Sequence, residues 1–188
     1  MNCKANIEKK PKTYGFTLLE SIIVVSIVAI ILAISVPLTI GLLGSNRGDS
    51  YLHQISRALE LARATAMSQN TAVIMCPSAD GATCNNIQDN NWGSNRIIVF
   101  SSSTGQVNNI DHIITTMNPP DGNDYLDWRG AGSLDFIRID QGGLSATNGT
   151  LSYCTILEDN TRFMRNYQLV INRMGRVRID YLKTPQPC

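Results

Sequence analysis

The feature that most constrains the fold of this chain is a long apolar segment close to its amino terminus. No charged residue lies between Glu20 and Arg47, and Ile22–Leu43 holds only apolar or small residues apart from two serines, one threonine and one proline. As a helix rising about 1.5 Å per residue, this segment can cross a hydrocarbon core of about 30 Å. The leader Met1–Gly15 carries four lysines against one glutamate, a net charge of +3, and such basic flanks stay in the cytoplasm. We therefore expect one membrane-length helix near the amino terminus.

The residues before this segment indicate how it is processed. An ordinary signal peptide is cleaved after its apolar region, at a site of the Ala-x-Ala type, and Ile40–Gly44 is a poor version of such a site. Gly15 followed by Phe16–Glu20 (Phe-Thr-Leu-Leu-Glu) resembles the processing motif of the type IV pilin class. This resemblance implies that a prepilin peptidase cleaves after Gly15, that Phe16 becomes the N-methylated first residue, and that the apolar helix is retained.

Glu20 is an acidic residue at the start of a membrane-length segment. A carboxylate costs about 2.5–3.5 kcal/mol at the membrane centre and less near the interface. The type IV pilin resemblance implies that Glu20 pairs with the Phe16 amine of a neighbouring subunit and sets the axial register in a filament. The alternative is a glutamate that stays hydrated among the lipid headgroups. The expected partners are other major and minor pilins, the prepilin peptidase, and the inner membrane before assembly.

The chain is expected to have three parts: a leader peptide at 1–15, a transmembrane or filament-core helix at 16–46, and a periplasmic domain at 47–188. The last part is long enough for a core of its own. After Arg47, apolar residues recur at three- and four-residue steps, which predicts an amphipathic continuation of the helix to about residue 68. These residues are Leu52, Ile55, Leu59, Ala62 and Ala66.

Seven short β-rich runs follow the helix, separated by Gly-, Asn- and Pro-rich connections. They are Thr71–Cys76, Arg96–Phe100, His112–Thr116, Leu134–Ile139, Leu151–Leu157, Tyr167–Asn172 and Arg176–Tyr181. Many short strands with turn residues between them predict antiparallel sheets, so the expected fold class is α+β, with a long helix packed on sheets. Asp121, Asp124 and Asp127 have part of a calcium-loop spacing but lack its order and terminal glutamate, so we expect a solvated loop there.

The domain contains four cysteines, and a fifth, Cys3, lies in the leader. On the outer side of a bacterial inner membrane the four would meet an oxidising compartment, where three disulfide connectivities are possible. We favour Cys76–Cys84, which closes a short polar loop, and Cys154–Cys188, which holds the end of the chain. No Cys-x-x-Cys pair occurs and the two histidines stand apart, so we expect no metal ion and no cofactor.

Several sequence blocks carry a closer resemblance, to the GspH/FimT family of minor pilins and pseudopilins. They are Leu61–Ala66, Asn70–Val73, Cys76–Gly81, Trp92–Gly93, Ile97–Phe100 and Gly175–Arg178. The resemblance implies a type IV pilin-like fold. It also implies a low-copy subunit near a filament tip, as opposed to the bulk pilin.

The charge of the domain is unevenly distributed. Residues 47–160 have six arginines against twelve acidic residues, a net charge of −6, whereas residues 161–188 have five arginines and one lysine against one aspartate, a net charge of +5. Tyr167–Asn172 and Arg176–Tyr181 alternate like two strands joined by Arg173–Gly175, a three-residue turn that ends in glycine. Arg176 and Arg178 then emerge on one side of the second strand, from positions about 6.6 Å apart. This basic end of an acidic domain predicts an anionic partner.

The anionic partner that the resemblance implies is DNA. Gly175, Arg176 and Arg178 match the Gly-Arg-x-Arg motif of the FimT branch, which takes part in DNA uptake during natural transformation. Arg173 is a third contact by geometry, and Lys183 would extend the surface. Guanidinium groups bind phosphate oxygens bidentately and nothing here indicates base reading, so we expect binding that is independent of sequence.

Two alternatives remain open at this point. Arginines on an edge strand can simply keep that edge soluble and unpaired. The chain would then be a minor pilin, or a pseudopilin of type II secretion, that primes filament assembly without binding DNA. An enzyme is not expected, because the sequence has no glycine-rich phosphate loop before a helix, no Gly-x-Ser-x-Gly and no His/Glu zinc motif.

Overall fold

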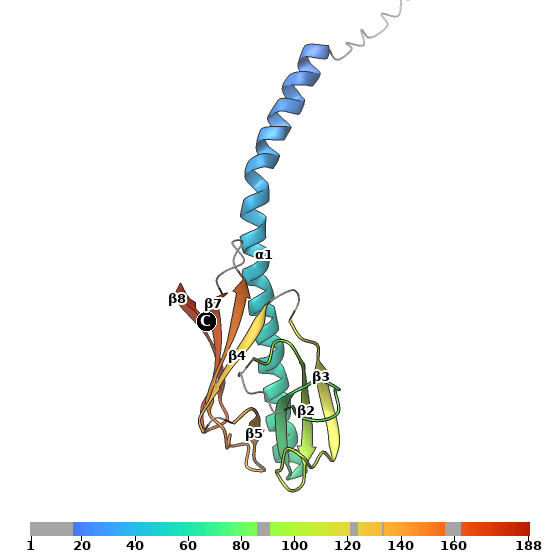
Figure 1. The fold of residues 1–188 in the computed structure, drawn as a ribbon, viewed down its shortest axis with the longest axis vertical. Coiled ribbons are helices and arrows are strands. Elements are labelled where there is room, and N and C mark those ends of the chain that lie inside the picture. Colours follow the sequence, from blue (N-terminus) through green and yellow to red (C-terminus); the bar gives the residue numbers. More distant parts are fainter. Residues whose placement is uncertain (1–16, 86–90, 121–123, 133, 157–162) are drawn as a thin grey trace, which may run out of the picture. The chain divides into compact units, whose positions relative to one another are not determined.

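The computed structural model describes residues 17–85, 91–120, 124–132, 134–156 and 163–188 (Figure 1). The chain divides into two compact units, Met1–Leu42 and Leu43–Cys188. The helix α1 (Leu18–Gln69) contributes residues to both units, and all eight strands belong to the second.

In the first unit, α1 begins with a capping arrangement. The backbone N–H of Glu20 donates to Oγ1 of Thr17 at 3.3 Å, so Thr17 caps the helix and the acidic Glu20 lies in the first turn, where the helix dipole favours a negative charge. The large apolar side chains between Leu18 and Leu32 are 49–79% exposed. Among the described residues, no helical stretch is both long enough and apolar enough to be assigned as a membrane span.

In the second unit, α1 has one buried face. The five residues that the periodicity predicts, Leu52, Ile55, Leu59, Ala62 and Ala66, are all buried. The helix ends at Gln69 because Asn70 adopts a left-handed φ of 51° and the N–H of Thr71 returns to the carbonyl of Ala66 at 3.2 Å. This pattern is a Schellman-type end.

Two antiparallel sheets of four strands each pack with this part of the helix (Figure 1). Sheet A has the order β3-β2-β1-β5 and sheet B the order β4-β6-β7-β8. The strands of sheet A are β1 (Ala72–Ser78), β2 (Arg96–Ser102), β3 (His112–Met117) and β5 (Ile137–Ile139); those of sheet B are β4 (Tyr125–Gly130), β6 (Gly149–Ile156), β7 (Phe163–Ile171) and β8 (Val177–Pro187). The predicted α+β class is thus confirmed.

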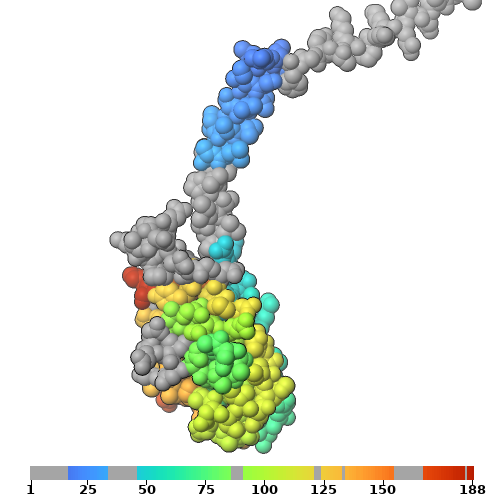
Figure 2. Space-filling model, turned by 45° about the vertical axis from the view of Figure 1, so that its right-hand side comes forward, coloured from blue at the N-terminus to red at the C-terminus, as the bar shows by residue number. Residues whose placement is uncertain are grey.

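One core joins the helix to both sheets. It contains the buried face of α1, residues of β1, β2 and β5 from sheet A, and residues of β4, β6 and β7 from sheet B. Trp92 and Trp128 lie in it, fully buried, with ring centroids 5.5 Å apart. A smaller cluster around Ile74 and Phe100 covers the other face of sheet A. Figure 2 shows a side of this unit where residues of sheet A and its connections are exposed, in green to yellow.

Strand β4 corrects the sequence prediction. The segment with the three aspartates was expected to be a solvated loop, but Tyr125–Gly130 pairs with β6 in sheet B. Leu126 and Trp128 point into the core, and Asp127 forms an ion pair with Arg129 at 2.7 Å on the other face. Asp121 lies outside the described residues. The aspartates concealed an alternation of apolar and polar residues that is typical of a half-buried strand.

Both disulfides that the sequence favours are present in the structure. Cys76–Cys84 closes the loop after β1, with Cα atoms 5.7 Å apart, and Cys154–Cys188 joins β6 to the end of the chain, with Cα atoms 6.3 Å apart. The carbonyl of Cys188 also accepts a hydrogen bond from Nη2 of Arg129 at 3.2 Å. The end of the chain is therefore held to β4 as well as to β6.

Candidate nucleic-acid interface

The turn between β7 and β8 has the geometry that its sequence predicts. Strand pairing ends at Ile171 and Val177, and the N–H of Gly175 donates to the carbonyl of Asn172 at 3.0 Å. Gly175 has a φ of 69°, which a residue with a side chain rarely adopts. The side chain of Asn172 accepts from the N–H of Arg176 at 3.0 Å. We call Asn172–Arg176, together with Arg178, the arginine hairpin.

The arginine hairpin is supported by two distant parts of the domain. The N–H of Ser145 donates to the carbonyl of Arg173 at 3.1 Å, and Nη1 of Arg63, on α1, donates to the carbonyl of Gly175 at 3.4 Å. Gly175 is buried, and a Cβ atom built on it would overlap the carbonyl oxygen of Gly143. The turn is therefore packed against the 140–145 segment and the helix and does not project freely into solvent.

The predicted phosphate-binding arginines differ in their surroundings. Arg173, Arg176 and Arg178 are all exposed. The side chain of Arg178 is 71% exposed, but its guanidinium lies 3.1 Å from the carboxylate of Asp180, two residues along the same strand face. Within the described residues, Arg173 and Arg176 form no ion pair with a carboxylate. The unbalanced positive charge of the hairpin is thus at its turn. The sequence analysis counted Asp180 in the net charge but did not predict its ion pair with Arg178.

Lys183 does not join this cluster. It is exposed on β8, and seven residues of extended strand place its backbone about 23 Å from that of Arg176. Of the other predicted site residues, Glu20 lies in the first turn of α1. Gly15 and Phe16 lie outside the described residues.

The pKa values of Asp80 and Tyr51 are perturbed by hydrogen bonds and burial within the fold. The carboxylate of Asp80 accepts from the N–H groups of Ala82 and Thr83 and from the hydroxyls of Thr83 and Ser78, and these bonds hold its pKa well below the usual value. Burial raises the pKa of Tyr51, whose hydroxyl donates to the carbonyl of Asn118 at 2.6 Å. Among the described residues there is no cluster of metal-ligating side chains.

Burial likewise raises the pKa of Tyr153, and the negative charge of Asp124 adds to the effect. The hydroxyl of Tyr153 donates to Oδ2 of Asp124 at 2.9 Å. Its ring packs beside that of Tyr51, with centroids 5.8 Å apart. This tyrosine pair thus links α1 to sheet B.

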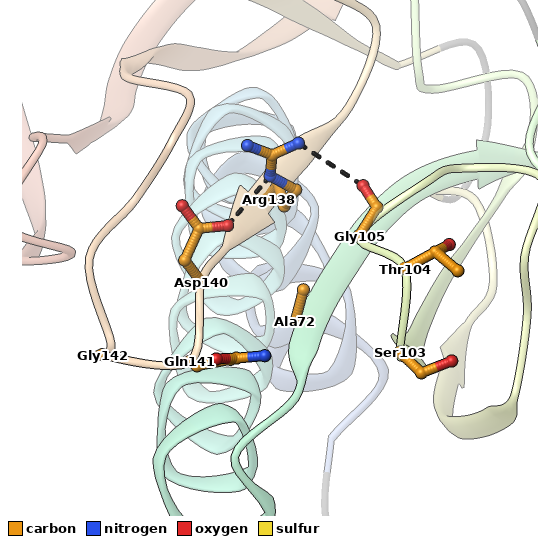
Figure 3. Close-up of a pocket in the computed structure, with 8 residues that line it drawn as sticks. All are labelled: Ala72, Ser103, Thr104, Gly105, Arg138, Asp140, Gln141 and Gly142. Atoms are coloured by element: carbon orange, nitrogen blue, oxygen red, sulfur yellow. Dashed lines mark hydrogen bonds and ion pairs between the residues drawn. The ribbon is translucent and has the colours of Figure 1, made fainter.

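A pocket of about 420 Å³ opens beside the start of β1 (Figure 3). It is lined by Ala72, Ser103, Thr104, Gly105, Arg138, Asp140, Gln141 and Gly142. The guanidinium of Arg138 donates to Asp140 at 3.0 Å and to the carbonyl of Gly105 at 3.4 Å (Figure 3). Its charge is therefore already balanced, and the pocket offers an anion little attraction.

Comparison with known proteins identifies the family to which the chain belongs. Residues 52–175 match the family described as type II transport protein GspH, and residues 10–36 match the prokaryotic N-terminal methylation motif. No curated protein matches the chain significantly.

Two solved structures of the type IV minor pilin FimU from Pseudomonas aeruginosa, in different crystal forms, have a similar fold. One has a TM-score of 0.53 at 16% identity and covers 76% of this chain and 94% of that one. The other has a TM-score of 0.50 at 16% identity, with coverages of 73% and 96%. At this identity the likeness shows the fold alone. The family match spans most of the domain and the methylation motif precedes it, so the chain belongs to the GspH family of type IV minor pilins and pseudopilins.

Proposed function

We propose that this chain is a minor type IV pilin that binds DNA without sequence specificity, through the arginine hairpin, for DNA uptake in natural transformation. The observation that carries the proposal is the exposed pair Arg173 and Arg176 at a supported turn, with no described carboxylate as ion-pair partner. The supported backbone of the turn holds the two arginines near each other, and each guanidinium group can bind two phosphate oxygens in one plane. Arg178 contributes less, because Asp180 shares its charge.

The location follows from the amino-terminal segment. We infer that a prepilin peptidase cleaves after Gly15, that the chain then starts at N-methylated Phe16, and that Glu20 pairs with the Phe16 amine of an adjacent pilin. The methylation-motif match and the exposed apolar residues of α1 support this inference. The chain would cross the inner membrane once, with residues 47–188 in the periplasm, and then enter the pilus.

The binding test uses residues 43–188. These residues form a compact unit that contains all the buried core residues of the part of the chain that the structure describes, and both disulfides; they exclude the lysines of the leader. Each phosphate contact on duplex DNA contributes about −0.9 to the log–log salt slope, so Arg173 and Arg176 together contribute about −1.8. We expect the double variant Arg173→Gln/Arg176→Gln to lose retardation of a labelled duplex at an unchanged melting temperature.

A matched control removes the same charge elsewhere. Arg57 and Arg96 are exposed on α1 and at the start of β2, and the double variant Arg57→Gln/Arg96→Gln should keep most of the binding. Equal losses in the two double variants would mean that only net charge matters, and the hairpin would not be a site. Asp180→Asn should instead strengthen binding, because it releases Arg178 and removes a negative charge.

The alternative function is assembly priming without DNA binding, as a minor pilin or a type II secretion pseudopilin. The family description as a type II transport protein favours it. A strain that carries Arg173→Gln/Arg176→Gln separates the two functions. Loss of transformation with normal piliation is expected if the chain captures DNA. If transformation is unchanged and the wild-type 43–188 fragment does not bind DNA, only the assembly function remains.

A further inference from the structure

We infer that Arg63 of α1 binds phosphate together with Arg173 and Arg176, and so takes the role that the sequence analysis gave to Arg178. The inference rests on the proposed function and identifies a residue that belongs to the same site. It predicts that bound DNA lies over the junction between the hairpin turn and the helix and not along β8.

The position of Arg63 supports this assignment. Nη1 lies 3.4 Å from the carbonyl oxygen of Gly175, and Nε lies 3.5 Å from where a Cβ of Gly175 would stand. Gly175 immediately precedes Arg176, and only Met174 separates it from Arg173. The Arg63 guanidinium therefore lies against the same turn that carries the two exposed arginines.

The charge balance distinguishes Arg63 from Arg178. Within the described residues, Arg63 forms no ion pair with a carboxylate, whereas Arg178 has Asp180 at 3.1 Å. Arg63 is partly exposed, and its contact with Gly175 uses one of its five N–H groups. Nε lies against Gly143 and Gly175, so the charge of the guanidinium and the N–H groups of its Nη atoms that do not bond Gly175 are the groups that we assign to a phosphate.

A purely structural role makes a different prediction. If Arg63 only held the carbonyl of Gly175, its loss would loosen the turn and lower stability without changing the number of phosphates neutralised. The salt dependence of binding counts those phosphates, since each contact on duplex DNA contributes about −0.9 to the log–log slope. The salt slope therefore separates the two roles.

The experiment measures affinity for a short labelled duplex against salt concentration, with the 43–188 fragment and single variants. With Arg63, Arg173 and Arg176 in contact, the wild-type slope is about −2.7, and affinity falls about 40-fold between about 50 and 200 mM salt. We expect Arg63→Gln to bring the slope to about −1.8 and the loss to about 12-fold. Arg63→Lys and Arg178→Gln should both keep the wild-type slope.

Each outcome is decisive. If Arg63→Gln lowers the melting temperature but keeps the wild-type slope, Arg63 is structural and the inference is wrong. If the Arg173→Gln and Arg176→Gln variants also keep that slope, the proposed function itself fails. Should Arg63→Gln not fold, the Nε–Hε NMR signal of Arg63 in the wild-type fragment provides the test. It should shift with the signals of Arg173 and Arg176 as DNA is added, and an unmoved signal would overturn the inference.

Discussion

Gly175→Ala tests whether the arginine hairpin is packed as closely as the structure has it. The left-handed φ of 69° costs a residue with a side chain about 1–2 kcal/mol. The new Cβ would also overlap the backbone carbonyl of Gly143, which cannot rotate away as a side-chain end could, and overpacking of this kind adds about 1–3 kcal/mol. We expect Gly175→Ala to lower the free energy of unfolding by about 2–5 kcal/mol in total.

Two other glycines allow the cost of backbone strain to be measured separately from the cost of overpacking. Gly132 has a φ of 80° with nothing within 4 Å of a built Cβ, so Gly132→Ala should cost only the backbone strain of about 1–2 kcal/mol. Gly142 also has open space around it, and its φ is not in the left-handed region. Gly142→Ala should therefore be neutral, or stabilising by up to about 1 kcal/mol.

Tryptophan fluorescence during thermal unfolding of the 43–188 fragment is a suitable assay, because Trp92 and Trp128 are both fully buried. A change of 1 kcal/mol moves the melting temperature of a domain of this size by about 2–4 °C. We expect Gly142→Ala to have the highest melting temperature of the three variants, Gly132→Ala a lower one and Gly175→Ala the lowest. If Gly175→Ala melts no lower than Gly132→Ala, the contact between the hairpin and Gly143 is absent and the argument for a supported turn is refuted.

Two further predictions concern the fold. Replacing Cys154 and Cys188 by alanine should lower the free energy of unfolding by about 4 kcal/mol, and replacing Cys76 and Cys84 by about 2.5 kcal/mol, from loop entropy. The difference arises because the first pair closes a loop with a sequence separation of 34 and the second a loop with a separation of 8. Urea unfolding measures both losses, and the reverse order would contradict the loop-entropy reasoning. Asp80 has a folded-state pKa below its ordinary value of 3.8, so its contribution to stability is complete above about pH 4 and is lost as the pH falls toward the folded-state pKa. The stability difference between wild type and Asp80→Asn should shrink below about pH 4, and a difference that stays constant in acid would show that ionisation of Asp80 is not the cause.

Much of the fold could be predicted because its signals are local. The buried face of α1, from Leu52 to Ala66, is visible as three- and four-residue spacing, and Gly175 marks the hairpin turn because few other residues tolerate its φ. Strand β4 was missed because its aspartates dominate a loop-like composition, although Leu126 and Trp128 alternate with polar residues. The aspartates on the solvent face lower the β-propensity of such a strand, but the packing of its buried face decides whether it forms.

The candidate site was only half predictable. The sequence by itself determined the apolar helix, the processing motif, the turn at Gly175 and the positive charge of the last 28 residues, because each depends on residues that are close along the chain. Tertiary structure alone decided that Arg63 lies against the carbonyl of Gly175, 112 positions away, and that the backbone of Gly143 packs against the same turn. The reason is physical: periodicity and turn chemistry act over a few residues, whereas the packing of a helix and two sheets into one core brings together groups that no local pattern connects.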